Sequence, residues 1–235
     1  YRAFNSRKVE FLDYTSYAGR SVYCNSLCFL LCKAARDVFP GCKIVLRRPI
    51  SKGYFCTITK EDGNPVAESE IGKIKARMRE MVEQDIPFRR HEVLVEEAIG
   101  LFRSLGYDDK VKLLETSGDI YVNYYTLDGT ADYYYEALLS STGYLNVWDL
   151  SAYRNGYLLR VPDRHKPEEL APFVEQPKTF EVFAENLRWN SFMGLENVGD
   201  PPRARRWVRP PAAPSGWIPT RLLPTISTST GATLR

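Results

Sequence analysis

Histidine is scarce in this sequence, which contains only His91 and His165 among its 235 residues. His91 lies in the stretch RRHEV on an expected strand, and His165 lies in the polar turn PDRHKPEE. Neither lies beside a serine or cysteine motif, so no pair of nucleophile and base can be argued. Both histidines are therefore expected at the solvated surface.

Phosphate-binding and metalloprotease motifs are missing as well. The chain has no G-x-x-x-x-G-K-[ST] loop, no G-x-G-x-x-G and no H-E-x-x-H. It also lacks an apolar run close to the roughly 18 residues of a membrane span. No catalytic residue and no metal ligand is predicted from spacing alone, and no membrane is expected as a partner.

Cysteine occurs five times, an odd number and too few for a disulfide scaffold. With no stretch typical of a secretory signal, a soluble, reduced and cytoplasmic protein is expected. Cys24, Cys28 and Cys32 recur every four residues in YCNSLCFLLC, which places them on one face of a helix. A fourth zinc ligand is missing nearby. Packing is favoured, and a metal or redox site stays open as an alternative.

The net charge of +3 is unevenly distributed. Residues 201–235 hold six arginines and no acidic residue, so residues 1–200 carry −3 from 26 basic and 29 acidic side chains. This tail also holds seven of the fifteen prolines and is expected to be disordered. Its composition also fits GC-rich DNA read in the wrong frame. The body offers no electrostatic basis for nucleic-acid binding, so nucleic acid is not expected as a partner.

Hydrophobic periodicity predicts an α+β fold with an antiparallel sheet and flanking helices. Apolar residues at intervals of three and four predict four helices, at residues 22–39, 70–84, 95–106 and 179–194. Alternating patterns and turn residues predict strands at residues 7–23, 42–59 and 88–94 and five consecutive strands, beginning with KVKLLE, between residues 110 and 162.

Tyrosines cluster at Tyr121, Tyr124 and Tyr125 and again at residues 133–135. An aromatic-rich sheet can stack nucleobases, normally with lysine and arginine close by. Residues 115–140 contain neither of these basic residues. Cross-strand aromatic packing is therefore expected, and a pocket for a small planar ligand is the alternative.

Several separate blocks, in this order, resemble the second N-terminal domain of threonyl-tRNA synthetases: LCFLLCKAARDVFPGCKIVLRRPISKGYFCTI, IGKIKARMREMVEQDIPFRRHEVLVEEAIGLFRSLGYDDKVKLLE and SSTGYLNVWDL. The same domain precedes the kinase domain of bacterial nucleoside kinases similar to uridine kinases. VEFLDYTS, PISKGYFC and RWNSFMGLENVGD resemble that second group more closely. The resemblance covers about residues 1–200.

The resemblance implies a division of the chain into four parts. Residues 1–20 resemble the end of a small ubiquitin-like TGS domain, and residues 21–165 resemble the synthetase-like second additional domain of the editing type. Residues 166–200 would form a helical linker toward a missing kinase domain. Residues 201–235 would be the disordered tail.

The synthetase domain removes wrongly attached amino acid from tRNA, using H-x-x-x-H on its first helix and C-x-x-x-H on a later strand. Those four positions fall on Asn25, Phe29, Tyr134 and Leu138. Phenylalanine and leucine neither bind metal nor act as a base. The resemblance thus implies a rebuilt cleft between helix 22–39 and the tyrosine-bearing strands. Its candidate binding residues are Asn25, Cys28, Phe29, Tyr54 and Tyr134.

The function expected from the resemblance is the regulatory or recognition part of a nucleoside (uridine) kinase. ATP and Mg²⁺ would serve only the missing kinase domain, so no cofactor and no phosphotransferase activity are expected in this chain. The cleft would bind a nucleoside or nucleotide, an aminoacyl group, or no ligand. Two alternatives stay open. One is an aminoacyl-tRNA editing-type deacylase or tRNA-binding module, and the other is a dimerisation module that forms a homo-oligomer.

Overall fold

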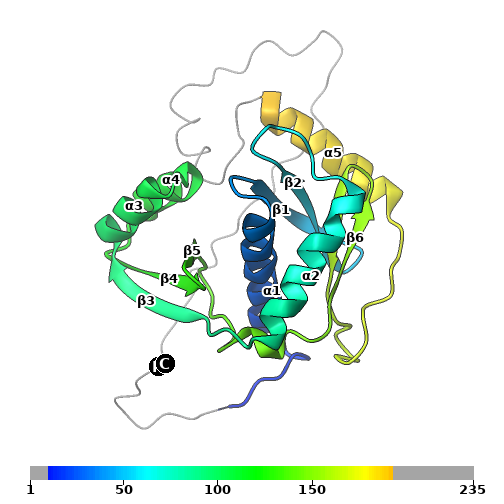
Figure 1. Ribbon diagram of the computed structural model, residues 1–235, viewed down its shortest axis with the longest axis horizontal. Coiled ribbons are helices and arrows are strands. Elements are labelled where there is room, and N and C mark those ends of the chain that lie inside the picture. Colours follow the sequence, from blue (N-terminus) through cyan, green and yellow to red (C-terminus); the bar gives the residue numbers. More distant parts are fainter. Residues whose placement is uncertain (1–9, 193–235) are drawn as a thin grey trace, which may run out of the picture.

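The computed structural model describes residues 10–192 and has an α+β fold with two antiparallel sheets, as predicted (Figure 1). Residues 1–9 and 193–235 lie outside the described part of the chain. The predicted disordered tail and half of the expected TGS remnant therefore fall outside it. The division of the chain into four parts stays a prediction.

The described elements run in the following order: α1 (Tyr17–Val38), β1 (Lys43–Ile50), β2 (Gly53–Thr59), the short 3-10 helix η1 (Glu68–Glu70), α2 (Ile71–Glu83), β3 (Arg89–Leu94), α3 (Val95–Ser104), α4 (Asp108–Ser117), β4 (Tyr121–Leu127), β5 (Thr130–Tyr133), the 3-10 helix η2 (Thr142–Tyr144), β6 (Asp149–Tyr153), β7 (Gly156–Arg160) and α5 (Pro177–Phe192).

The larger part of the molecule, which we call the body, is built on a four-stranded sheet in the order β1-β2-β7-β6 (Figure 1). Successive side chains of β2 point to opposite faces of this sheet, as in any pleated strand. Cys56 and Ile58 join the core formed with α1 and α2, whereas Phe55 packs against α5. The Phe55 ring lies 5.5 Å from Phe180 and 5.9 Å from Phe183, measured between ring centroids. Helices therefore cover both faces.

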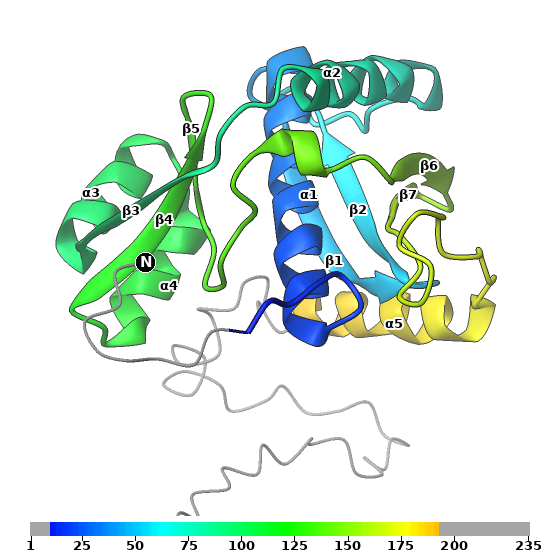
Figure 2. The same ribbon diagram turned by 90° about the horizontal axis from the view of Figure 1, so that it is seen from below.

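A smaller part, which we call the small lobe, lies beside α1 and holds the three-stranded sheet β3-β4-β5 (Figure 2). Helices α3 and α4 cover one face, where Phe102 and Leu114 pack on Val122 of β4. On the opposite face, the side chains of Tyr125 and Leu127 pack in the core of the body. Because residues alternate along β4, one strand thus supplies both cores.

The strands predicted within residues 7–23 are wrong for the described residues. Helix α1 already begins at Tyr17, because the side chain of Ser16 accepts a hydrogen bond from the backbone N–H of Gly19 at 3.0 Å. Such a cap satisfies one of the free N–H groups at a helix start. Phe11, expected to point inward, is 96% exposed.

The strand predicted at KVKLLE is also wrong, because these residues lie in helix α4. Val111 and Leu114, three residues apart, share the buried face of the helix. Asp108 and Asp109 lie in its first turn, where negative charge stabilises a helix. The helix ends at Gly118, which adopts φ 73°.

Candidate functional site

Two of the predicted cleft residues, Phe29 and Tyr134, are in direct contact. Phe29 lies on α1 and is fully buried, and Tyr134 directly follows strand β5. Their ring centroids are 5.4 Å apart, with 37° between the ring planes. Segments more than a hundred residues apart therefore meet at the positions where the resemblance places the synthetase site.

The space around this contact is filled by apolar side chains. The ring of Phe88 lies 5.9 Å from that of Phe29. Leu138, the last of the four aligned positions, packs against the same core. Burial raises the pKa of the Tyr134 hydroxyl well above its ordinary value, so this hydroxyl stays neutral near pH 7. The arrangement at these positions is that of a packed core.

Asn25 lies at the rim, where it contacts a carboxylate that the sequence reading did not single out. Its side-chain amide donates to Glu136 Oε2 at 3.2 Å, and the Ser21 hydroxyl donates to the same oxygen. Asn25 is partly buried and Glu136 is exposed. The pattern gave no sign of Glu136, because an isolated glutamate in the stretch DYYYEALL has the ordinary appearance of a surface residue.

Cys28 and the other cysteines are buried thiols without disulfide partners. Burial is the main cause that raises the pKa of Cys28 well above its ordinary value, and neighbouring Cys32, Cys24 and Cys56 add to it. Burial likewise raises the pKa of Cys32 and of Cys56 to about 12. Thiols with such pKa values are protonated at neutral pH and are poor nucleophiles. The packing interpretation of Cys24, Cys28 and Cys32 is confirmed by their burial.

Tyr54, the fifth predicted residue, lies on β2 next to the N-terminal half of α1. Burial is the main cause that raises the pKa of its hydroxyl, and Cys24 and Cys28 of α1 lie close enough to add to it. The five predicted residues thus form a filled contact at Phe29 and Tyr134, a polar rim at Asn25 and a packed interior at Cys28 and Tyr54.

Two basic side chains lie where α1 faces the small lobe, Arg36 on α1 and Lys110 on α4. The Arg36 guanidinium carbon is 4.9 Å from the ring centroid of Tyr107. Lys110 forms an ion pair with Asp132 of β5 and lies 4.6 Å from the same Tyr107 ring. Nη1 of Arg36 is buried without a hydrogen-bond partner. Lys110 is thus paired with a carboxylate, and Arg36 supplies the positive charge beside the filled contact.

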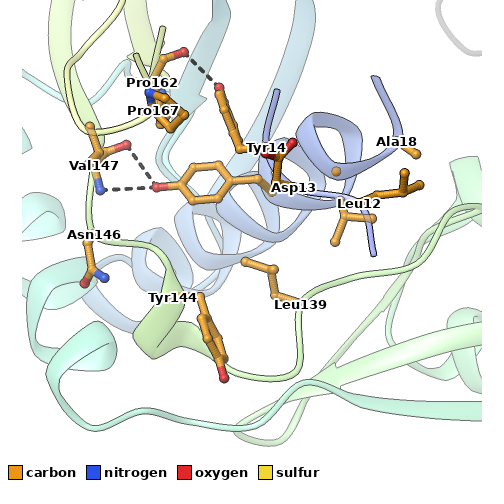
Figure 3. A pocket seen from close by; sticks show the side chains of 13 residues that line it. Leu12, Asp13, Tyr14, Ala18, Leu139, Tyr144, Asn146, Val147, Pro162 and Pro167 are labelled. Carbon is orange, nitrogen blue, oxygen red and sulfur yellow. Dashed lines mark hydrogen bonds between the residues drawn. The ribbon is translucent and has the colours of Figure 1, made fainter. Parts of the chain in front are cut away.

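A cavity of about 490 Å³ opens beside the N-terminal end of α1 (Figure 3). Val22, three residues before Asn25 on α1, and Leu139 line it. Tyr14 closes one wall by donating its hydroxyl to the Pro162 carbonyl at 2.8 Å. The Tyr23 hydroxyl donates to the Val147 carbonyl at 3.0 Å and accepts from the same residue's N–H at 3.2 Å. With the hydroxyls of Tyr14 and Tyr23 engaged, two of the three tyrosines that line the cavity already have hydrogen-bond partners, and the cavity presents mainly apolar surface.

Curated proteins that match this chain include threonine–tRNA ligases. The ligase of Rubrobacter xylanophilus is 29% identical over 150 residues, which cover 64% of this chain and 23% of the ligase. That of Geobacter sp. strain M21 is 26% identical over 150 residues, with the same two coverages. The ligase of Phenylobacterium zucineum is 33% identical over 86 residues, 37% of this chain and 13% of the ligase. No family model matches the chain.

These matches support a domain similar to part of a threonyl-tRNA synthetase. The chain spans about a quarter of the length of the first two of these relatives. The expectation that the chain is part of a nucleoside or uridine kinase is wrong, because the matches are synthetases and give a kinase no support. The expectation that this chain itself uses no cofactor, with ATP and Mg²⁺ serving only a missing kinase domain, stays a prediction.

No helix within residues 10–192 is both long and apolar enough to span a membrane. Nucleoside binding and homo-oligomerisation stay predictions, since the described structure contains neither a ligand nor a second chain. The same holds for the five candidate binding residues as a ligand site.

Proposed function

We propose that this chain is a tRNA-binding module built on an editing-type synthetase domain, and that it does not hydrolyse aminoacyl-tRNA. The observation that carries the proposal is the contact between Phe29 and Tyr134. The similarity to threonine–tRNA ligases supports the scaffold, while packed rings stand at the positions of the histidine and cysteine of the resembled site. A binding role needs the scaffold alone, whereas hydrolysis needs a group that activates water.

A charge next to the filled contact supports an anionic partner. Arg36 lies where α1 faces the small lobe, and phosphate contacts from such side chains supply much of the affinity for nucleic acid. Lys110 is already paired with Asp132, so the support comes from Arg36. The proposal replaces the expectation that nucleic acid is not a partner. That expectation relied on the summed charge of residues 1–200, which says nothing about local clusters.

Deacylation is the rival, and one observation favours it. Glu136 accepts hydrogen bonds from Ser21 and Asn25 at the rim, and an exposed carboxylate can serve as a general base toward water. In that case hydrolysis would depend on Glu136 and Asn25. It would need no metal and no histidine, and the Phe29 contact would only form the floor of the site.

One pair of assays separates the two functions. We expect the full chain to bind tRNA in a fluorescence anisotropy titration, with affinity that falls as salt rises. We expect seryl-tRNA and threonyl-tRNA to be hydrolysed no faster with the protein than without it. Hydrolysis that disappears in Glu136→Gln would replace the binding module with a deacylase. Absence of tRNA binding at low salt would overturn the proposal altogether.

A further inference from the structure

A second cavity, of about 380 Å³, opens on the sheet of the small lobe. Its walls include Arg89 and His91 of β3, Tyr124 and Thr126 of β4, and the turn at Asp128. In the antiparallel register His91 lies opposite Tyr124 and Arg89 opposite Thr126. These four side chains therefore share one face of the sheet, the face opposite to Tyr125 and the filled contact.

Helices α3 and α4 cover only part of this face. They pack over the end of the sheet that holds Val93 and Val122. Arg89 and His91, at the beginning of β3, lie beyond this packing and line the cavity. The volume lies within the range of about 300–1,000 Å³ that is usual for small-molecule pockets.

Aromatic rings lead from the core of the small lobe to the cavity. Phe102 packs edge-on against Tyr124, with ring centroids 6.1 Å apart. His91 stacks on Tyr124 at 4.8 Å, with only 17° between the ring planes. His91 Nε2 also lies 2.9 Å from the Thr126 hydroxyl, a hydrogen bond that fixes the ring orientation. His91 is thus the last, firmly held ring of a stack that ends at the cavity.

Arg89 supplies charge next to this ring. Two residues of a strand on the same face are separated by about 7 Å, and Arg89 is exposed. Within residues 10–192 no carboxylate is paired with it. The carboxylate that lines the cavity, Asp128, lies instead 3.4 Å from Lys33 and 3.9 Å from Arg77, measured between charged atoms. The positive charge of Arg89 is therefore available to a ligand.

We propose that this cavity binds a nucleotide, with the base stacked on His91 and the phosphate at Arg89. Bases stack on aromatic side chains whatever their identity, and a neighbouring cation fixes the backbone phosphate. The nucleotide is either free or part of a single-stranded RNA, since both present a base and a phosphate. The site lies outside the predicted cleft and does not depend on the tRNA proposal.

The experiment uses the full chain and four probes: AMP, adenosine, ribose 5-phosphate and a short single-stranded oligoadenylate. Isothermal titration gives affinity for the wild type and for His91→Ala and Arg89→Ala. Two control variants match them, His165→Ala for the other histidine and Arg90→Ala for the adjacent arginine, which hydrogen-bonds Asn123. His91→Phe keeps an aromatic ring, and thermal unfolding shows that each variant is folded.

We expect AMP or the oligonucleotide to bind and His91→Ala to weaken binding about 5- to 150-fold, with partial recovery in His91→Phe. We expect Arg89→Ala to weaken the binding of AMP and to leave the binding of adenosine unchanged. Both control variants should bind the probes as tightly as the wild type does. Binding of AMP itself identifies a free nucleotide, and binding of the oligonucleotide alone identifies RNA. No binding of any probe, or equal binding by folded His91→Ala, would overturn the site.

The two proposals can fail separately. If AMP binds through His91 while tRNA does not bind, the nucleotide site stands and the tRNA-binding module falls. If tRNA binds equally well to the wild type and to His91→Ala, the module stands and the nucleotide site is overturned as a part of tRNA recognition. The AMP titration then decides whether it survives as a site for free nucleotide.

Discussion

The ring of Phe29 on α1 lies 5.4 Å from the ring of Tyr134, which follows β5. This contact joins the body to the segment that leaves the small lobe. It also occupies the positions where the resembled synthetase site has histidine and cysteine. The contact between Phe29 and Tyr134 therefore holds the two parts of the molecule together. It is also the reason for proposing binding without hydrolysis.

Replacing Phe29 by alanine removes the ring that packs against Tyr134 and Phe88. Because Phe29 is fully buried and touches two other rings, we expect Phe29→Ala to lower the free energy of unfolding by about 3–5 kcal/mol. Phe11→Ala is the control, since Phe11 is 96% exposed and should change stability by less than about 0.5 kcal/mol. Urea denaturation followed by circular dichroism measures both, and equal effects would contradict the packing described here.

The buried thiols make stability depend on pH in the alkaline range. The folded-state pKa of Cys32 and of Cys56 is raised to about 12 from an ordinary 9.0, so the unfolded chain loses these protons first. Stability is therefore full below about pH 9 and falls as pH rises toward 12, by at most about 1.4 kcal/mol per pH unit and thiol. Urea denaturation across this range should show the decline, with a smaller slope in Cys56→Ala. If the decline of stability with pH has the same slope in Cys56→Ala as in the wild type, the buried Cys56 thiol does not cause it.

The beginning of α1 depends on one hydroxyl. Ser16 Oγ accepts from the Gly19 N–H at 3.0 Å, so Ser16→Ala should lower the free energy of unfolding by about 1 kcal/mol. Ser16→Asp keeps an acceptor at the cap and should remain close to the wild type. Thermal unfolding of the three proteins provides the measurement. If the alanine and aspartate variants are equally destabilised, the cap does not act as described.

Two glycines should respond to alanine in opposite directions. Gly118 ends α4 with φ 73°, a conformation that costs an L-residue about 1 kcal/mol or more. Gly72 lies inside α2 with no atom within 4 Å of an added Cβ. Gly118→Ala should therefore destabilise the protein, whereas Gly72→Ala should stabilise it by up to about 1 kcal/mol. Urea midpoints that move in the same direction would refute the helical assignment of α4 or α2.

The sequence predicts the helices and the hairpin of the body well, because their signals are local. Ile71, Ile74, Met78 and Met81 recur at helical spacing and do form the buried face of α2. The segment KVKLLE was misleading because Val111 and Leu113 alternate with Lys110 and Lys112, as in a strand. The aspartates before it and Gly118 after it are the helix signals that decide its structure.

Relations between distant segments are the part that sequence cannot supply. The absence of lysine and arginine from residues 115–140 argued against nucleobase stacking at the tyrosines. The structure brings Arg89 and His91 from β3 beside Tyr124, and no local pattern encodes this pairing. In the same way Glu136 becomes a candidate only through its hydrogen bonds to Ser21 and Asn25.

The small lobe leaves and re-enters the body at adjacent points of the chain. The backbone N–H of Phe88 bonds the carbonyl of Ser140 at 3.0 Å, and that of Thr142 bonds Ile86 at 2.9 Å. The lobe is thus one continuous stretch of chain whose two ends are already hydrogen-bonded to each other at its base. The strand order of the body's sheet therefore does not depend on the lobe, although the apolar core of the body that Tyr125 and Leu127 enter does.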